Sequence, residues 1–302
     1  MAEAIERRCG FVALIGAPNV GKSTLVNALV GAKVSIVTPK VQTTRTLMRG
    51  IAIVDHAQLI FVDTPGIFSP RRRLDRAMVG TAWGSTQDAD LVALLIDSRK
   101  GLKDDDEAIL SALGGVRPAK VLVLNKVDLV AKPVLLALTQ KLNERAAFAA
   151  TFMISALAGD GVADLKRWFA AHVPAGPWLY PEDQISDAPA RQLAAEITRE
   201  KLYLRLHQEL PYQSTVETEA WKELKDGSVR IEQTIYVERE SQRKIVLGKA
   251  GQAIKAIGAA ARADIAAAIE QPVHLFLNVK VRQGWGDDPE RYREMGLEFP
   301  KE

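Results

Sequence analysis

Eight residues near the start of the chain have the types and spacing of a phosphate-binding loop. They read Gly-Ala-Pro-Asn-Val-Gly-Lys-Ser and fit the pattern G-x-x-x-x-G-K-[S/T]. Glycines allow backbone angles that a Cβ would forbid, so several N–H groups can point at one anion. The lysine supplies a charge for the β- and γ-phosphates, and the serine hydroxyl is placed to ligate Mg²⁺. The predicted nucleotide contacts from this loop are Gly16, Ala17, Pro18, Asn19, Val20, Gly21, Lys22, Ser23 and Thr24.

A second polar motif, Asp-Thr-Pro-Gly, directly follows the apolar run 59–62. A carboxylate at a strand end can hold the Mg²⁺ shell, and the glycine N–H can reach a γ-phosphate. By itself the motif is also a good tight turn. Its pairing with the first loop favours a phosphate site. The predicted nucleotide contacts here are Asp63, Thr64, Pro65, Gly66 and Ile67.

Residues 40–45, Lys-Val-Gln-Thr-Thr-Arg, lie between these two motifs. They form either a plain connecting loop or a mobile segment whose threonine caps the γ-phosphate through Mg²⁺. We favour the second alternative, with Thr44 as that threonine. The predicted metal ligands are Ser23, Thr44 and Asp63, and the predicted catalytic residues are Lys22, Thr44, Asp63 and Gly66.

A third motif, Asn125-Lys126-Val127-Asp128, follows another apolar run and indicates selection of guanine. An ionised Asp128 offers two acceptor oxygens to the N1–H and N2–H₂ donors of guanine, and adenine has no donors there. Asn125 can brace neighbouring loops, and the stem of Lys126 can lie over the base. After a later strand come Ser155 and Ala156, where the Ala156 N–H is placed to meet guanine O6.

Hydrolysis is expected to be slow without a partner. Many small GTPases carry a water-orienting glutamine directly after the glycine of the second motif, and this chain has Ile67 there. An isoleucine side chain has no polar atom with which to position water.

The first half of the chain has the pattern of an α/β domain with a mainly parallel sheet. Apolar strands alternate with helical segments, and each motif follows a strand, where ligands of such sheets bind. The predicted strands are 11–15, 50–54, 58–62, 91–96, 120–124 and 151–154. We expect a GTP-binding domain over residues 1–175, a proline- and acid-rich linker over 176–190, and a second domain over 191–302.

The second domain has the predicted order α-β-β-α-α-β. Its elements are a helix over 191–208, strands over about 215–221 and 228–238, helices over 245–251, 252–257 and on to about 269, and a strand over 273–281. Gly-Lys-Ala-Gly at 248–251 stands between the two central helices, which is the layout of a KH RNA-binding domain. Alone, G-x-x-G is also a common helix–helix turn, but five positive charges against one negative over 239–255 favour RNA. The predicted RNA contacts are Arg239, Arg243, Lys244, Gly248, Lys249, Ala250, Gly251 and Lys255.

Composition sets looser bounds on function. A net charge of +3 is too small to indicate nucleic acid by itself, and the single cysteine, Cys9, favours a reducing compartment. No apolar run is long enough for a membrane span, and residues 1–9 lack the apolar core of a signal peptide.

Taken together, the motifs resemble those of the Era family, bacterial GTPases with a C-terminal KH domain. Further marks of the resemblance are Gln42-Thr43-Thr44-Arg45, Glu209-Leu210-Pro211-Tyr212, Gln271-Pro272-Val273-His274-Leu275 and Gly284-Trp285. The resemblance implies GTP or GDP and Mg²⁺ as ligands, and binding of the 3′-terminal region of small-subunit ribosomal RNA during assembly of the small ribosomal subunit. It also implies a cytoplasmic monomer that can associate peripherally with the inner membrane. In GTPases similar to this family, the asparagine at the position of Asn19 can ligate a potassium ion, so the resemblance implies that Asn19 can do so here.

Two other classes remain open at this stage. The chain could be a signalling or membrane-associated GTPase whose C-terminal domain is a protein-interaction module. It could also be an RNA-binding protein whose nucleotide is merely structural.

Asp128→Asn tests the guanine assignment. A carboxamide donates where the carboxylate only accepts, so the variant should prefer xanthine nucleotides, which carry a carbonyl at that position, by about a hundredfold or more. The measurement is competition: unlabelled GTP and unlabelled XTP are each used to displace a labelled nucleotide from the protein, and their affinities are compared. An unchanged affinity for GTP would contradict the assignment.

Overall fold

The computed structural model describes residues 6–40, 43–206, 210–284 and 288–300. Val41, Gln42, Glu209 and Trp285, which belong to motifs named above, lie outside the described residues. The chain divides into two compact units. The first comprises Met1–Ser35, Thr44–Asp187 and Arg293–Glu302, and the second comprises Ile36–Thr43 and Ala188–Tyr292. Two short segments thus change unit. Residues 36–43 follow the first unit in sequence but group with the second, and residues 293–302 follow the second unit but group with the first.

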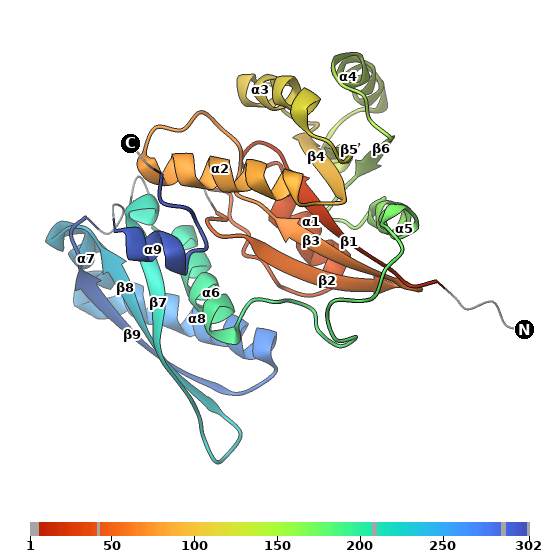
Figure 1. Ribbon diagram of the computed structural model, residues 1–302. Helices are drawn as coiled ribbons and strands as arrows, with labels where there is room; N and C mark the ends of the chain where they lie inside the picture. Colours follow the sequence, from red (N-terminus) through yellow and green to blue (C-terminus); the bar gives the residue numbers. More distant parts are fainter. Residues whose placement is uncertain (1–5, 41–42, 207–209, 285–287, 301–302) are drawn as a thin grey trace, which may run out of the picture. The chain divides into compact units, whose positions relative to one another are not determined.

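The first unit is built on a six-stranded sheet with the strand order β2-β3-β1-β4-β5-β6 (Figure 1). β2 pairs antiparallel with β3, and the other neighbours pair in parallel. This confirms the predicted α/β class with a mainly parallel sheet, and every predicted strand is present. The strands are β1 Arg8–Ile15, β2 Met48–Val54, β3 Ala57–Asp63, β4 Leu91–Asp97, β5 Ala119–Asn125 and β6 Ala150–Ile154.

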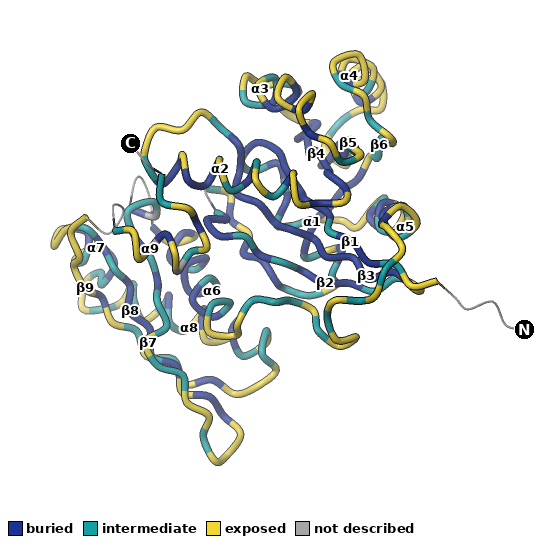
Figure 2. Tube along the Cα trace, in the orientation of Figure 1, coloured by how far each residue is buried: buried dark blue, intermediate teal, exposed yellow. Residues whose placement is uncertain are grey.

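Helices cover this sheet, so its strands are apolar along their length rather than alternating. Every residue of β3 and β4 is buried, as Figure 2 shows for the centre of the sheet. α1 and α5 contact each other and also β2 and β3, and α2 lies on the opposite face (Figure 1). The helices are α1 Lys22–Val30, α2 Arg73–Gln87, α3 Asp104–Ala112, α4 Lys132–Arg145 and α5 Val162–His172.

Residues 176–187, expected as part of a linker, group with the first unit. The reason is a buried glutamine on β3. The Gln58 side-chain oxygen accepts the N–H groups of Leu179 and Tyr180 at 2.8 and 3.0 Å, and its amide donates to the Tyr180 carbonyl at 2.8 Å. Further along, the Ile51 N–H of β2 donates to the Ile185 carbonyl at 2.8 Å. The segment is thus fastened to the sheet, and the long stretch of the second unit begins after it, at Ala188.

The second unit has the predicted order α-β-β-α-α-β. Its sheet runs β7-β8-β9, with β7 and β8 antiparallel and β8 and β9 parallel. α6 and α8 contact each other, and they pack on β7 and β9 respectively. The elements are α6 Ala190–Arg205, β7 Ser214–Glu223, β8 Val229–Val237, α7 Glu240–Leu247, α8 Gln252–Ile269, β9 Val273–Val281 and, beyond the expected set, α9 Pro289–Glu294.

Two expectations in this unit are wrong. The helix expected over 245–251 is α7, which spans Glu240–Leu247 and ends before Gly248, whose positive φ does not continue a helix. Residues 252–269 form a single helix, α8, rather than two. Alanines, which favour helix, make up much of this segment, and the single glycine at 258 lowers the helix propensity without ending the helix. Within the described part of the chain, no helix combines the length and apolar character needed to cross a membrane.

A pair of glycine-to-alanine changes tests the packing of the first unit. At Gly50 on β2 a Cβ would lie 2.7 Å from Val30 and 3.0 Å from Val26 of α1, whereas at Gly80 in α2 it would meet no atom within 4 Å. Gly50→Ala should therefore destabilise the unit by about 1–3 kcal/mol, and Gly80→Ala should stabilise it by about 0.5–1 kcal/mol. Urea unfolding of both variants measures whether the free energy of unfolding falls or rises relative to the unchanged protein. Equal effects would contradict the close contact of α1 with β2.

Candidate nucleotide-binding site and RNA-binding surface

The predicted phosphate loop joins the end of β1 to the start of α1, so the helix N-terminus faces the loop as an anion site requires. Its glycines stand where no Cβ fits. At Gly16, with φ of 148°, a Cβ would lie 2.5 Å from the Leu95 carbonyl, and at Gly21, with φ of 104°, one would lie 2.2 Å from the Asn125 amide nitrogen. The loop is thus in close contact with β4 and with the predicted base-binding motif.

Lys22 is buried within this loop, with 6% of its surface exposed. Its Nζ donates to the carbonyls of Gly16 and Ala17 at 3.0 and 3.1 Å. Burial lowers the pKa of Lys22 to about 8, although the Asp63 carboxylate acts in the opposite direction. A phosphate beside the ammonium would favour its charged form, so the site is suited to an anion.

The three predicted metal ligands converge. The Ser23 and Thr44 hydroxyl oxygens are 2.9 Å apart, and the Thr44 hydroxyl donates to Asp63 Oδ2 at 3.2 Å. Asp63 is fully buried, which raises its pKa, and Lys22 and the Ser23 hydroxyl oppose the rise. Its Oδ1 has no hydrogen-bond partner among the described residues. Two hydroxyls and a buried carboxylate are the oxygen donors that Mg²⁺ prefers, so these residues fit the ion.

Gly66 approaches the phosphate loop so closely that a Cβ would lie 2.9 Å from the Pro18 Cα. The next residue, Ile67, donates its N–H to the Gly16 carbonyl at 3.1 Å, and its side chain belongs to the hydrophobic core, 5% exposed. The side chain therefore packs into the core of the first unit. This geometry agrees with the expectation that Ile67 does not orient the nucleophile.

Asn125 joins three loops through one buried side chain. Its amide donates to the Val20 carbonyl at 2.8 Å, and its oxygen accepts the N–H groups of Lys126 at 2.8 Å and Ala156 at 3.0 Å. The bracing role expected of Asn125 is present in the structure. The Ala156 N–H is engaged by Asn125 here, so its contact with guanine O6 stays a prediction.

Asp128 is exposed, and within the described part of the chain no hydrogen bond or ion pair holds its carboxylate. It belongs to the short 3₁₀ turn Val127–Leu129, and Lys126, which directly precedes that turn, has a φ of 64°. Both oxygens are accordingly accessible to a base.

Sequence reasoning missed Asp97, the last residue of β4. Its carboxylate, 3% exposed, accepts Lys126 Nζ at 2.7 Å, and the same Nζ donates to the Asn19 carbonyl at 2.7 Å. Asp97 thereby ties the base-binding motif to the phosphate loop. An acidic residue ending the apolar run 91–96 at the carboxyl edge of the sheet was the available signal. Asn19, expected near potassium, has a φ of 64°.

The Gly-Lys-Ala-Gly loop connects α7 to α8 through a short 3₁₀ turn. Three of its four residues have positive φ, namely Gly248 at 71°, Ala250 at 50° and Gly251 at 76°. A Cβ at Gly248 would lie 2.6 Å from the Ala253 Cβ, whereas a Cβ at Gly251 would meet no atom within 4 Å. The open space at Gly251 allows a phosphate backbone to come close.

The predicted RNA-binding side chains gather around this loop, and most are accessible. Those exposed are Arg239, Lys244, Lys249 and Lys255. Arg243 is partly held by the protein itself, since it donates to the Val279 carbonyl at 3.2 Å and pairs with Glu240 at 2.9 Å. On α7, Ile245 is 57% exposed and adds an apolar surface against which a base can pack.

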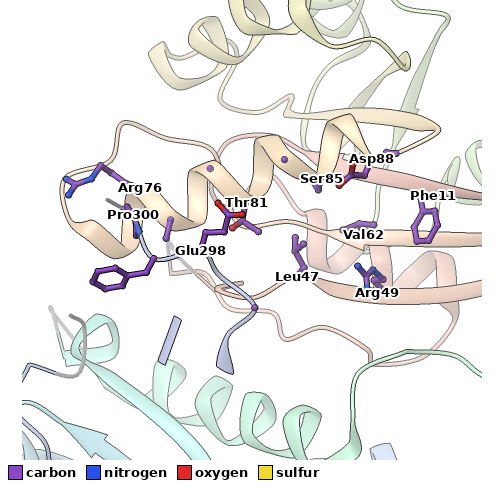
Figure 3. Close-up of a pocket in the computed structure, with 16 residues that line it drawn as sticks. Phe11, Leu47, Arg49, Val62, Arg76, Thr81, Ser85, Asp88, Glu298 and Pro300 are labelled. Carbon is purple, nitrogen blue, oxygen red and sulfur yellow. The ribbon is translucent and has the colours of Figure 1, made fainter. Parts of the chain in front are cut away.

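A cavity of about 690 Å³ lies elsewhere in the first unit (Figure 3). It is lined by α2 with Gly80 and Gly84, by the strands near Phe11 and Val62, and by Gly296, Glu298, Phe299 and Pro300. Its lining includes none of the predicted nucleotide residues. The nucleotide site is therefore assigned from the loops at the carboxyl ends of the strands.

The phosphate loop, the converging oxygen groups that fit Mg²⁺ and the Asn-Lys-x-Asp loop, all at the end of a mainly parallel sheet, define a P-loop GTPase, here followed by a KH domain. Family models agree: the model of 50S ribosome-binding GTPases matches residues 11–126, and the KH domain model matches residues 209–286. The GTPase Era of Afipia carboxidovorans is 70% identical over 300 residues, 99% of this chain and 97% of that protein. That of Bradyrhizobium diazoefficiens is 70% identical over 98% of this chain and 96% of the relative. The chain belongs to the Era family of GTPases.

Solved structures of Era are similar over nearly the full length. A complex of Era with MgGDPNP and nucleotides 1506–1542 of 16S ribosomal RNA is 36% identical, with a TM-score of 0.91 over 96% of this chain and 99% of that one. A variant of Aquifex aeolicus Era bound to GDP and AlF₄⁻ is 37% identical, with a TM-score of 0.89 over the same shares. The protein is a GTPase that uses guanine nucleotide and Mg²⁺.

Asn125→Ala tests the bracing of the nucleotide site. It removes three hydrogen bonds and leaves buried backbone groups of two loops without partners, so GDP affinity should fall about tenfold to a hundredfold. Asn143→Ala is the matched control, because this exposed asparagine on α4 only donates to the Thr139 carbonyl. Titration with a fluorescent GDP analogue measures both. Equal affinities in the two variants would show that Asn125 does not hold the loops.

Proposed function

We propose that the protein is a GTP-hydrolysing switch that binds the 3′-terminal region of small-subunit ribosomal RNA and acts in assembly of the small ribosomal subunit. The observation that carries the proposal is the open, positive-φ Gly-Lys-Ala-Gly loop with four exposed basic side chains around it. The Era relative that binds nucleotides 1506–1542 of 16S ribosomal RNA supports the choice of RNA.

In the proposed nucleotide site each loop has one task. The backbone N–H groups of residues 19–24 and the Lys22 ammonium hold the phosphates, while Asp128 accepts the guanine donors. Asn125 and the Asp97–Lys126 pair keep the base-binding loop against the phosphate loop. Ser23, Thr44 and Asp63 would hold Mg²⁺, which when bound would neutralise charge at the phosphate oxygens.

Hydrolysis transfers the γ-phosphoryl group to water. The water oxygen forms the new bond to the γ-phosphorus, the bond from that phosphorus to the β–γ bridging oxygen breaks, and GDP and phosphate result. Lys22 and the Gly66 N–H stabilise the developing charge on the phosphate oxygens. Because Ile67 is buried in the core and has no polar atom, no side chain at this position holds the water, and turnover without a partner is slow.

The RNA would lie against the loop between α7 and α8. The positive φ angles at Gly248, Ala250 and Gly251 turn the backbone so that phosphates can approach N–H groups, and the exposed lysines add charge. Bases would pack on apolar surface such as Ile245, since single-stranded RNA is recognised through splayed bases. Membership of the Era family further supports a cytoplasmic monomer, with peripheral contact at the inner membrane.

Two matched glycine changes test the RNA site. Gly251 and Gly227 have similar φ angles, 76° and 80°, and a Cβ at either meets open space, but Gly227 lies in the β7–β8 hairpin away from the loop. Gly251→Asp places a carboxylate where phosphate must approach, so affinity for a labelled RNA from the 3′ end of small-subunit ribosomal RNA should fall at least about tenfold. Gly227→Asp should leave it unchanged.

The measurement compares protein loaded with GDP and with a non-hydrolysable GTP analogue at several salt concentrations. Tighter binding in the GTP form that Gly251→Asp abolishes is the expected result. Weak binding that disappears with salt and ignores the variant would mean simple polyelectrolyte attraction. The protein-interaction alternative would then replace the proposal.

A further inference from the structure

Two buried polar atoms in the first unit have no hydrogen-bond partner among the described residues. They are the Ser35 hydroxyl oxygen and Asp63 Oδ1. Ser35 is 1% exposed and Asp63 is fully buried. A buried polar group without a partner costs stability, so such groups are rare in folded proteins and can indicate a site that a ligand or an ordered water completes.

The Ser35 hydroxyl lies near the Asp63 carboxylate. Burial raises the pKa of Asp63. The neighbouring groups that oppose this rise are the Ser23 hydroxyl, the Lys22 ammonium and the hydroxyls of Ser35 and Thr44. Ser35 is thus close enough to affect the carboxylate, although its oxygen does not meet the carboxylate in hydrogen-bond geometry. It stands beside the same carboxylate as two predicted metal ligands, Ser23 and Thr44.

One asparagine fixes the backbone of Ser35. The Asn27 side-chain oxygen accepts the N–H groups of Val34 and Ser35, both at 2.9 Å, and its amide donates to the Ser35 carbonyl at 2.8 Å. Asn27 stands four residues after Ser23 in α1, and residues with this spacing share one face of a helix. The helix that presents the Ser23 hydroxyl therefore also holds Ser35 in place.

Val34 fixes the same turn through apolar packing. It is 1% exposed and belongs to the hydrophobic core of the first unit. Its side chain lies close to Gly50 of β2, where an added Cβ would come within 3.1 Å of it. Because hydrogen bonds from Asn27 and core packing of Val34 both restrict this turn, the Ser35 hydroxyl is preorganised beside Asp63. All of these residues belong to the first unit.

We propose that Ser35 is a positioning residue of the magnesium site, whose hydroxyl and Asp63 Oδ1 together hold one water of the Mg²⁺ shell. Mg²⁺ prefers octahedral oxygen ligands and usually keeps several waters. A water can donate one hydrogen to each of the two acceptors, which satisfies both unpaired atoms. The proposal rests on the magnesium site proposed above for Ser23, Thr44 and Asp63, and it does not rest on the ribosomal RNA proposal.

Loss of the hydroxyl should weaken the metal site and leave the protein around it intact. Within the described chain the hydroxyl has no hydrogen bond to lose, and Ser35→Ala keeps the backbone bonds to Asn27. A structural defect would speed nucleotide release whether or not Mg²⁺ is present. A defect in the Mg²⁺ shell affects release only when Mg²⁺ is bound, because only a ligand that contacts the altered group can sense the change.

The experiment compares Ser35→Ala with Ser98→Ala. Ser98 is a matched control, because it is 2% exposed and its hydroxyl likewise has no partner in the described part of the chain. It follows β4 instead of α1, and its N–H donates to the Asn125 carbonyl of β5 at 3.0 Å. Ser23→Ala is the positive control for the magnesium site itself.

For each full-length variant, release of a fluorescent, non-hydrolysable GTP analogue is followed over a range of free Mg²⁺ concentrations and in excess EDTA. Binding of Mn²⁺ to the nucleotide complex is measured from the EPR signal of free Mn²⁺, because Mn²⁺ takes the same oxygen ligands. For Ser35→Ala we expect the Mg²⁺ concentration that half-maximally slows release to rise about fivefold to tenfold, and Mn²⁺ affinity to fall by a similar factor. Release in EDTA should match that of the unchanged protein. Ser98→Ala should change none of these.

The proposal is overturned if Ser35→Ala keeps the Mg²⁺ and Mn²⁺ dependence of the unchanged protein, or if it speeds release equally in EDTA. If Ser23→Ala also leaves the Mg²⁺ dependence unchanged, the magnesium site itself is wrongly assigned and both proposals fail. If Ser23→Ala weakens that dependence and Ser35→Ala does not, the magnesium site stands and only the role of Ser35 fails. These readouts contain no RNA, so either failure leaves the RNA test intact.

Discussion

The nucleotide site depends on the contact between the phosphate loop and the base-binding loop, which the Asn125 side chain holds in place. One carboxamide donates to Val20 and accepts from Lys126 and Ala156, so three loops from three strands have a fixed separation. Asp97 adds a second connection through Lys126 to the Asn19 carbonyl. A guanine nucleotide must contact both loops at once. Because the loops already have a fixed separation, binding loses little conformational entropy in ordering them.

This close contact explains why glycines stand where they do. A Cβ at Gly21 would overlap the Asn125 amide, and one at Gly66 would overlap Pro18, so the loops can meet only because these side chains are absent. The same closeness buries Lys22 and Asp63 near each other, and burial lowers the pKa of Lys22 and raises the pKa of Asp63, which favours the neutral form of each. Phosphate and Mg²⁺ bring the charges that such a site lacks.

Much of this arrangement could be predicted from sequence because each motif is short and its chemistry is local. The phosphate loop, residues 16–24, is recognisable from the spacing of its glycines, lysine and serine. The other motifs also follow strands of a parallel sheet, so all the loops are expected at one edge of that sheet. Pairings between distant residues could not be predicted in this way. Nothing near Gln58 marks it as the residue that fastens Leu179 and Tyr180, and Asp97 gains its role only through the neighbouring strand β5. The single helix α8 was misjudged because Gly258 weakens the local signal without breaking the helix.

The segment 36–43 shows the same limit at the scale of domains. From sequence it belongs with the phosphate loop, since it lies between two motifs of the nucleotide site, and in the structure its contacts are with α6. A GTPase needs some element that carries the presence of the γ-phosphate to the part of the protein that binds a partner. Here Thr44, the predicted Mg²⁺ ligand of the first unit, directly follows Thr43, which groups with the second unit, so the boundary between the units falls beside the predicted γ-phosphate site.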